Sequence, residues 1–402
     1  MSKETKVVVI GGGYAGVTAA NRLTQRADVA VTLVNARPDF VERIRLHQLA
    51  GGSDDAVVEY REVLAERVRL VVGTVTRIDA GERAVRLADG DTLGYDYLIY
   101  AVGSRSEVPD VPGAAEFAYP LGDLDEAKRL RAALDAAPAA AAVTVVGAGP
   151  SGIETAAELA EAGRSVTLAC GGSLGPYLHP RGRQAVAKRL AKLGVTVLDG
   201  PGSKVTAVTR ETVGLSDGRE IPSEVTVWTA GFGVPGLAAS SGLSTDALGR
   251  LRTDETLTSV DDPRVIAAGD SAGPSDRPFR MSCQAAGPLG GHAADTVLHR
   301  IAGEPATPIE LGFVGQCLSL GRQGGLFQFS HRNDVATAFH IGGRLGAKLK
   351  EIVCAGTVKQ LTREAAKPGS ASWSWSKDNE RRKAVQAKEA AVAPPKRTEP
   401  AA

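Results

Sequence analysis

Short runs of apolar, β-branched residues alternate with glycine turns and helical stretches along most of the chain. The first run, residues 6–10, is followed by a glycine-rich turn at 11–16 and by a stretch at 17–23 that predicts a helix. A second apolar run follows at 29–34. A buried strand that passes through a tight turn into a helix and on to a second strand is typical of a parallel, doubly wound sheet. The pattern therefore predicts an α/β fold that begins with a Rossmann-like unit.

The turn between the first strand and the first helix has glycines at a meaningful spacing. Gly11 permits a tight turn, Gly13 lets the backbone approach a pyrophosphate, and Gly16 allows close packing of helix on strand. The helix N-terminus adds unpaired N–H groups that favour phosphate. The alternative is a glycine-rich turn without a ligand. The predicted binding residues of this turn are Gly11, Gly12, Gly13, Tyr14, Ala15 and Gly16.

The same pattern recurs in the middle of the chain. An apolar run at 143–146 leads into a second G-x-G-x-x-G turn, and a helix and a strand at 165–169 follow. Two such turns, each between a strand and a helix, predict that one chain holds two dinucleotides. One would be a flavin held permanently and the other a nicotinamide nucleotide that comes and goes. The predicted binding residues of the second turn are Gly147, Gly149, Pro150, Ser151 and Gly152.

The residue after the second strand of each unit bears on the choice of nucleotide. Asn35 stands where a ribose-binding carboxylate is usual, and an amide can still hydrogen-bond a ribose hydroxyl. In the second unit the strand ends in Cys-Gly-Gly at 170–172, so no carboxylate discriminates against a 2′-phosphate. We therefore expect NAD(P)H, with no preference between NADH and NADPH.

The length, charge and cysteine content of the chain exclude some classes of function. The 402 residues are enough for two or three domains, and a net charge of +1 offers no basic field for nucleic acid. The four cysteines are too dispersed for a zinc site or a redox dithiol, and no metal site is predicted. The first strand begins too early for a signal peptide, and no apolar run approaches the roughly 18 residues of a spanning helix. We expect a cytoplasmic protein.

Three further segments match a known arrangement. Residues 98–103 resemble the end of a first FAD segment, 227–231 the strand that leaves an NAD(P)H domain, and 265–271 a second FAD fingerprint. Together with the two turns they resemble, over residues 5–300, the two-dinucleotide-binding-domain flavoproteins of the pyridine nucleotide-disulfide oxidoreductase superfamily. The resemblance implies FAD and NAD(P)H as cofactors, with Asp270 on the ribityl chain of the flavin. The further residues that it assigns to FAD are Ala101, Gly103, Gly269 and Asp270, besides Asn35.

This resemblance implies two Rossmann-like domains and a small C-terminal α+β interface domain. A helix is expected from about 343 to 362, with Leu345, Leu349, Ile352 and Val353 on its apolar face. The expected parts are an FAD-binding domain at residues 1–121 and 244–305, an NAD(P)H-binding domain at 122–243, the interface domain at 306–364, and a disordered or partly helical tail at 365–402.

Within the superfamily the chain resembles the type II NADH dehydrogenase and apoptosis-inducing-factor-like group. It lacks the cysteine pair of the disulfide reductases after the first helix, and residues 282–286 and 317–322 match the group. The resemblance implies two catalytic residues, Glu154 near the nicotinamide and Gln284 near the flavin ring. Otherwise Glu154 would complement the helix N-terminus, and Gln284 would make a hydrogen bond at a helix start. Pro288 stands where type II enzymes carry a second glutamine that lines the quinone site.

The implied reaction passes hydride from NAD(P)H to the flavin and then electrons to a quinone-like small acceptor. Two alternatives are a reductase for a protein such as a ferredoxin and a flavin-based redox sensor with slow turnover. Related dehydrogenases lie on the membrane through C-terminal amphipathic helices. The helix therefore has two interpretations: a peripheral contact at the inner face of the cell membrane, or docking on its own domain. A homodimer is a further possibility. Trp373 and Trp375 would either grip the membrane interface or dock on the body.

Overall fold

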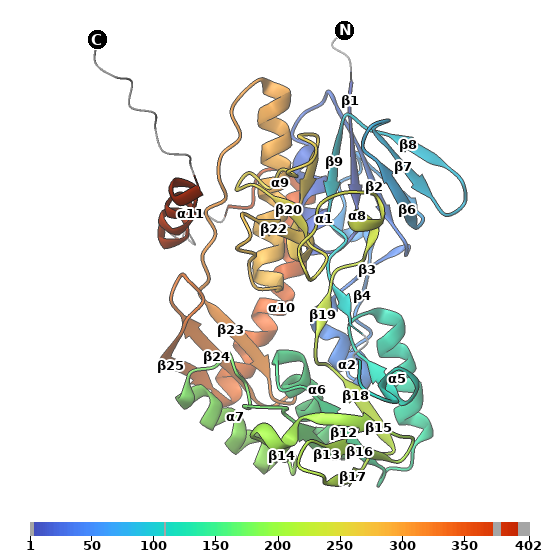
Figure 1. Ribbon diagram of the computed structural model, residues 1–402, viewed down its shortest axis with the longest axis vertical. Helices are drawn as coiled ribbons and strands as arrows, with labels where there is room; N and C mark the ends of the chain where they lie inside the picture. Colours follow the sequence, from blue (N-terminus) through green and yellow to red (C-terminus); the bar gives the residue numbers. More distant parts are fainter. Residues whose placement is uncertain (1–3, 108–109, 373–378, 393–402) are drawn as a thin grey trace.

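Two parallel-sheet units, one above the other in Figure 1, form most of the molecule. This computed structural model describes residues 4–107, 110–372 and 379–392. The C-terminal part of the chain packs along one side of both units. The expected α/β architecture of two Rossmann-like sheets and a small α+β part is confirmed.

The first unit is a five-stranded parallel sheet in the order β21-β9-β1-β2-β5. The strand β1 lies at its centre because its residues 7–10 are apolar on both faces and therefore need cover on both. The last strand in sequence, β21, pairs with β9, so two distant stretches of chain build this sheet. The strands are β1 (Thr5–Ile10), β2 (Val29–Asn35), β5 (Val68–Val72), β9 (Tyr97–Tyr100) and β21 (Val265–Ala267).

Two long helices pack on this sheet, α1 (Tyr14–Leu23) and α9 (Cys283–Ala302). They approach closely because Gly290 of α9 faces the backbone of Ala15, where a Cβ would overlap the carbonyl oxygen. The smaller elements of the unit are β3 (Asp39–Val41), η1 (Arg43–Arg45), α2 (Leu46–Gly51), β4 (Val57–Glu59), α3 (Tyr60–Val63), β6 (Val75–Asp79), β7 (Ala84–Leu87), β8 (Thr92–Gly94), α8 (Leu237–Ser240), β20 (Leu251–Thr253), η3 (Gly269–Ser271) and β22 (Ala272–Pro274).

The second unit repeats the design with the strand order β11-β18-β12-β13-β14. Its strands are β11 (Ala118–Pro120), β12 (Ala142–Val146), β13 (Ser165–Ala169), β14 (Thr196–Leu198) and β18 (Val225–Trp228). Its helices are α4 (Ala114–Phe117), α5 (Leu124–Ala136), α6 (Pro150–Glu161), α7 (Pro180–Lys192) and η2 (Pro201–Ser203). An antiparallel sheet beside them consists of β15 (Val205–Val208), β16 (Thr212–Leu215) and β17 (Glu220–Pro222). The strands β10 (Arg105–Ser106) and β19 (Phe232–Gly233), in the two connections between the units, pair with each other.

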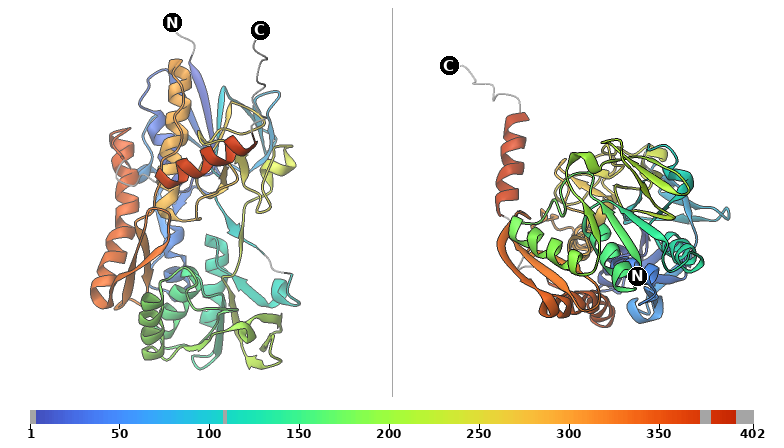
Figure 2. Two further views of the ribbon diagram at one scale, coloured as in Figure 1. Left: turned by 60° about the vertical axis from the view of Figure 1, so that its left-hand side comes forward. Right: turned by 90° about the horizontal axis from the view of Figure 1, so that it is seen from below.

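The C-terminal part bridges the two units. It consists of a three-stranded antiparallel sheet, β23 (Gly315–Ser319), β24 (Gly325–Ser330) and β25 (Ala336–Gly342), and the helix α10 (Gly343–Ala366). Leu318 and Leu326 of the sheet belong to the core of the second unit, while Leu361 of α10 belongs to the core of the first. The helix expected at 343–362 is present and runs four residues further. The left view of Figure 2 shows it along one side of the molecule.

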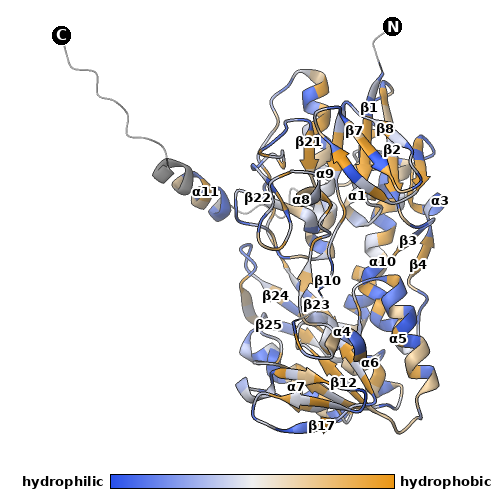
Figure 3. Cartoon of the chain, turned by 45° about the vertical axis from the view of Figure 1, so that its right-hand side comes forward, coloured by the Kyte–Doolittle hydropathy of each residue, from blue (hydrophilic) through white to orange (hydrophobic). Residues whose placement is uncertain are grey.

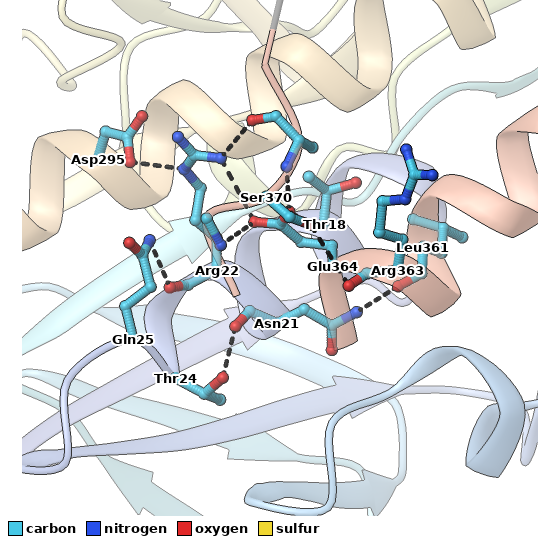
Figure 4. Close-up of polar contacts among 12 residues, drawn as sticks. Thr18, Asn21, Arg22, Thr24, Gln25, Asp295, Leu361, Arg363, Glu364 and Ser370 are labelled. Carbon is cyan, nitrogen blue, oxygen red and sulfur yellow. Dashed lines mark hydrogen bonds and ion pairs between the residues drawn. The ribbon is translucent and has the colours of Figure 1, made fainter. Parts of the chain in front are cut away.

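A buried polar network fixes α10 on the first unit, as Figure 4 shows. The Arg22 guanidinium donates to Asp295 of α9 at 2.6 Å and to Glu364 of α10 at 3.3 Å. The Glu364 carboxylate is fully buried and also accepts the backbone N–H groups of Gly369 and Ala371, each at 2.7 Å. Each of its oxygens therefore has partners, which a buried carboxylate requires.

Hydropathy follows this layering. Figure 3 shows the strands of both parallel sheets mainly in the hydrophobic colour, whereas the helix α5 carries both hydrophobic and hydrophilic residues, as expected for a helix with one buried face. Across residues 4–107, 110–372 and 379–392, none of the helices has the length and apolarity needed to cross a membrane.

The expected apolar face of α10 is divided in the structure. Leu345 and Ile352 are 57% and 65% exposed, whereas Val353 lines an internal cavity. The tail contains a further helix, α11 (Asn379–Val392), which stands out from the body in the right view of Figure 2. Trp373 and Trp375 lie outside the described residues.

Candidate active site

A cavity of about 550 Å³ lies where the two units and the C-terminal part meet. Its wall includes Tyr14 from the first unit, Pro150 and Ser151 from the second, and Gly315 and Lys350 from the C-terminal part. Clefts between domains are the usual place for a cofactor or substrate. The starts of both glycine-turn helices therefore face one shared space.

The first glycine turn has the geometry that a dinucleotide needs. Gly11 has a φ of +101°, and a Cβ there would overlap the carbonyl oxygen of Ala101. A Cβ on Gly16 would overlap the carbonyl oxygen of Gly11, so this glycine is needed for the turn itself. A Cβ on Gly13 would meet no atom within 4 Å. Gly13 therefore leaves an open cradle at the helix N-terminus, where a pyrophosphate would lie.

The second turn repeats these three features. Gly147 has a φ of +106°, and a Cβ on Gly152 would overlap the Gly147 carbonyl oxygen. A Cβ on Gly149 would meet no atom within 4 Å. The two turns are physically equivalent, so each can hold a pyrophosphate in the same manner.

Asn35 stabilises the first glycine turn through two hydrogen bonds to the backbone. Its Oδ1 accepts the Gly12 N–H at 2.9 Å, and its Nδ2 donates to the carbonyl oxygen of Arg37 at 3.0 Å. Both ends of the amide thus bind backbone groups, and the Gly12 N–H is already used. The structure assigns Asn35 a role in shaping the turn, next to the ribose contact expected from the sequence.

A polar group from three segments lies at another side of the cavity. Ser104 donates to Asp270 Oδ2 at 2.7 Å, and the Arg43 guanidinium donates to Ser104 Oγ at 3.0 Å. Arg43 lies 3.9 Å from Asp270 and also donates to the Gly122 carbonyl oxygen at 3.0 Å. Gly103 and Gly269, at φ values of +68° and +65°, turn the chain beside this group. Arg43 therefore belongs to the Asp270 side of the cavity wall.

Glu154 forms a buried ion pair that the sequence did not reveal. It is 6% exposed, and its Oε1 lies 2.8 Å from the Nζ of Lys350, which is 8% exposed. The N–H of Ser319 also donates to Oε1 at 2.9 Å. His47 of α2 completes the group, with its Nδ1 3.9 Å from Glu154 Oε2. Each of Glu154, Lys350 and His47 lines the cavity, and each comes from a different part of the fold.

The charges of this group follow from its burial. Burial alone would raise the pKa of Glu154, but the Lys350 ammonium, helped by the Ser319 N–H, outweighs it, so the pKa of the carboxyl is lowered. The pKa of Lys350 is raised well above its ordinary value because Glu154 outweighs the cost of burial. Burial lowers the pKa of His47 to about 4. At neutral pH the group is a carboxylate, an ammonium and a neutral imidazole.

Gln284 holds the loop that forms the cavity rim. With its amide oriented to satisfy both partners, its nitrogen donates to the Gly315 carbonyl oxygen at 2.8 Å and its oxygen accepts the Val314 N–H at 3.0 Å. Gln284 and Pro288 both line the cavity, one turn apart on α9. Pro288 therefore lies at the cavity wall where type II enzymes carry a second glutamine, and it offers no amide there.

The cysteines at the cavity are protonated. Cys283 and Cys317 line it. Burial raises the pKa of both thiols, to about 11 for Cys317. Neither is therefore a thiolate nucleophile at neutral pH.

The residues present fit FAD and a nicotinamide nucleotide. Gly13 and Gly149 each leave the open cradle that a pyrophosphate needs, and Asp270 and Arg43 supply hydrogen-bonding groups beyond the first turn. Sequence reasoning found the glycine turns, Glu154, Gln284 and Asp270. It missed His47 and Lys350 as site residues because neither lies in a recognisable motif.

Two dinucleotide turns on a shared cavity define a class of protein, the oxidoreductases that bring two dinucleotides together. The comparisons agree. The chain belongs to the pyridine nucleotide-disulphide oxidoreductase family, which matches residues 5–289. The family resemblance is confirmed, the chain is a pyridine-nucleotide oxidoreductase, and membership implies FAD and NAD(P)H as its cofactors.

Among curated relatives, the NADH dehydrogenase-like protein Rv1812c of Mycobacterium tuberculosis is 32% identical over 355 residues, which cover 80% of this chain and 87% of the relative. The type II NADH:quinone oxidoreductase Ndh of the same organism is 32% identical over 312 residues, 66% of this chain and 67% of the relative. Among solved structures, the sulfide:quinone oxidoreductase of Aquifex aeolicus has a TM-score of 0.75 at 19% identity and covers 91% of this chain and 93% of that one. At 19% identity, the similarity to this solved structure shows only a shared fold.

Proposed function

We propose that this chain is an FAD-dependent NAD(P)H oxidoreductase that passes electrons to a quinone-like small acceptor. The observation that carries the proposal is the buried Glu154–Lys350 pair in a cavity shared by two dinucleotide turns. The relative named as a type II NADH:quinone oxidoreductase supports the acceptor class.

In this proposal the first turn, with Asp270, holds FAD, and the second turn holds NAD(P)H. Because β11 pairs within the second sheet and α8 packs against β6 of the first unit, we place the two inner boundaries before β11 and before α8 rather than at residues 121 and 243, and the third at residue 305 as expected from the sequence. When bound, the flavin supplies the chemistry that accepts two electrons from the nicotinamide and yields them to the acceptor. The chain itself binds and orients the two ring systems and keeps water out of the cavity.

The buried pair has a further part in the proposal, because quinone reduction takes up protons. Lys350 holds a proton on Nζ at the cavity wall, and the Glu154 carboxylate keeps this ammonium charged. Lys350 Nζ is therefore proposed to hydrogen-bond the acceptor and to stabilise the negative charge that the acceptor gains before it is protonated. Gln284, by fixing residues 314–315, would shape the acceptor side of the cavity.

Anaerobic titration of the purified flavoprotein tests the proposal. We expect NADH or NADPH to bleach the flavin absorption and a quinone such as menadione to restore it in repeated turnovers. Rapid turnover with ferredoxin and none with menadione would instead favour a protein reductase. Slow reoxidation by every acceptor would favour a redox sensor, and a protein that takes up no FAD would contradict all three.

A peripheral membrane contact remains part of the proposal and has a separate test. Leu345 and Ile352 of α10 and Phe339 of β25 are more than half exposed. Cosedimentation with liposomes should fall for a Leu345→Ser/Ile352→Ser variant if this face touches the membrane. An unchanged sedimentation would contradict the contact, and a dimer that dissociates in the variant would place a second copy there instead.

A further inference from the structure

His47 has a nitrogen without a partner in the wall of the cavity. None of the described residues makes a hydrogen bond with its Nε2, and the side chain is 4% exposed. An unsatisfied buried polar atom in a native fold calls for an explanation such as a bound water or ligand. This atom is on a residue that lines the cavity, which makes a ligand the relevant candidate.

The neighbours of His47 decide which hydrogen bond it can make. The Glu154 carboxylate lies on the Nδ1 side at 3.9 Å and favours a proton on Nδ1. The imidazole is neutral, so Nε2 then carries a lone pair and accepts a hydrogen bond. The missing partner is therefore a donor. A quinone offers only carbonyl acceptors, whereas the carboxamide of a nicotinamide ring offers an N–H donor.

The position of His47 points to the nucleotide as well. The helix α2 packs against α6, the helix that begins at the second glycine turn. Glu154 lies one turn into α6, and Pro150 and Ser151 at its start line the same cavity. A nucleotide held at Gly149 would extend its nicotinamide along this wall.

We propose that Nε2 of His47 accepts a hydrogen bond from the carboxamide N–H of the nicotinamide ring and so determines specificity for a nicotinamide nucleotide. The inference rests on the proposed function of the second turn. It adds the residue that recognises the ring, and it predicts that His47 distinguishes a carboxamide from groups of similar shape that lack the N–H.

The experiment uses the holoenzyme and two oxidised nucleotides that differ in this group. One is NAD⁺, or NADP⁺ if NADPH bleaches the flavin, and the other is its 3-acetylpyridine analogue, in which a methyl group replaces the amide nitrogen. Binding is measured by titration calorimetry, which does not depend on turnover. The variants are His47→Leu, His47→Gln, which restores an acceptor, and the control His292→Leu. His292 is a buried histidine with an unpartnered Nε2 that does not line the cavity.

We expect His47→Leu to weaken the natural nucleotide about tenfold, the loss of one hydrogen bond, and the analogue by less than about twofold. His47→Gln should recover most of the affinity, and His292→Leu should change neither nucleotide. Equal losses of affinity for both nucleotides in His47→Leu, or no loss, would overturn the inference. The proposed function would still stand if NAD(P)H bleaches the flavin of the wild type. A wild type that binds neither nucleotide and does not bleach would overturn both.

Discussion

At the scale of the residue, the chain contains buried sets of opposite charges that compensate each other. Glu154 and Lys350 form one such set, and neither is more than 8% exposed. Removing one partner from a buried pair leaves an uncompensated charge, whereas replacing both with apolar groups of similar size can be nearly neutral. The pair thus offers a test of structure that is separate from catalysis.

We expect Lys350→Met alone, which strands the Glu154 carboxylate, to lower the free energy of unfolding by about 3 kcal/mol. The double variant Glu154→Leu/Lys350→Met should lose less than Lys350→Met alone, because no buried charge remains. Denaturant unfolding of the single and double variants gives both numbers. A double variant that loses as much as Lys350→Met, or more, would contradict the interaction of the two charges. In the double variant, turnover with a quinone should be lost even though the fold is retained.

His47 makes stability depend on pH. Its pKa falls to about 4 in the folded protein from 6.5, so below pH 6.5 the unfolded chain binds a proton that the folded chain does not. Stability from this residue is therefore complete above pH 6.5 and is lost between pH 6.5 and 4, by about 3 kcal/mol. His47→Gln should flatten this slope of the unfolding free energy. The same slope in variant and wild type would place the titration elsewhere.

At the scale of the element, the two strand–turn–helix units were predictable from sequence. Their strands and turns combine local signals, since β-branched runs, glycine spacing and helix starts lie within about 25 residues of each other. Asp270 was found because it directly follows a buried strand of recognisable pattern. His47 and Lys350 lie on helices whose partners are distant in sequence, and contacts of that kind leave no local periodicity.

The glycines of one turn should separate cofactor binding from folding. Gly13→Ala adds a methyl group where the protein has open space, so the melting temperature of the flavin-free protein should stay within about 2 °C while flavin content falls sharply. Gly16→Ala would collide with the Gly11 carbonyl oxygen and should destabilise the fold itself. Flavin content and thermal melts of the two variants give the comparison.

Gly149→Ala serves as the matched variant in the second turn. It should keep the yellow colour and lose bleaching by NAD(P)H. Normal bleaching in Gly149→Ala, or full flavin content in Gly13→Ala, would contradict the assignment of the two turns.

At the scale of the whole molecule, the start of helix α11 is attached to the body by two neighbouring arginines, of which Arg382 pairs with Glu310 and Arg381 makes more contacts. Arg381 pairs with Glu255 at 2.8 Å, donates to the carbonyl oxygens of Arg277 and Pro274, and stacks on Phe279 with its Cζ 4.1 Å from the ring centre. The next residue after Phe279, Arg280, lines the cavity. The sequence could not predict this contact, because the tail has a composition typical of disorder.

Arg381→Gln should therefore cost about 2 kcal/mol of unfolding free energy and speed proteolytic cleavage of the tail, since charged hydrogen bonds are lost from a site that is 9% exposed. The control is Lys383→Gln, whose side chain is 72% exposed and whose pairing with Glu380 should contribute little. Equal behaviour of the two variants in limited proteolysis and denaturant unfolding would show that α11 does not dock through Arg381.

The strand β21 is synthesised long after its neighbour β9, and this affects folding during translation. The apolar strand β9 at Tyr97–Tyr100 leaves the ribosome long before its neighbour at Val265–Ala267, and until then it is an open edge of the first sheet. At about 5 to 20 residues per second, the intervening chain takes on the order of 10 to 30 s to make. During that time the nascent sheet exposes an unpaired edge strand, which can pair with other chains. The second unit is made in this interval, and we expect the nascent chain to need chaperone cover until the last strand arrives.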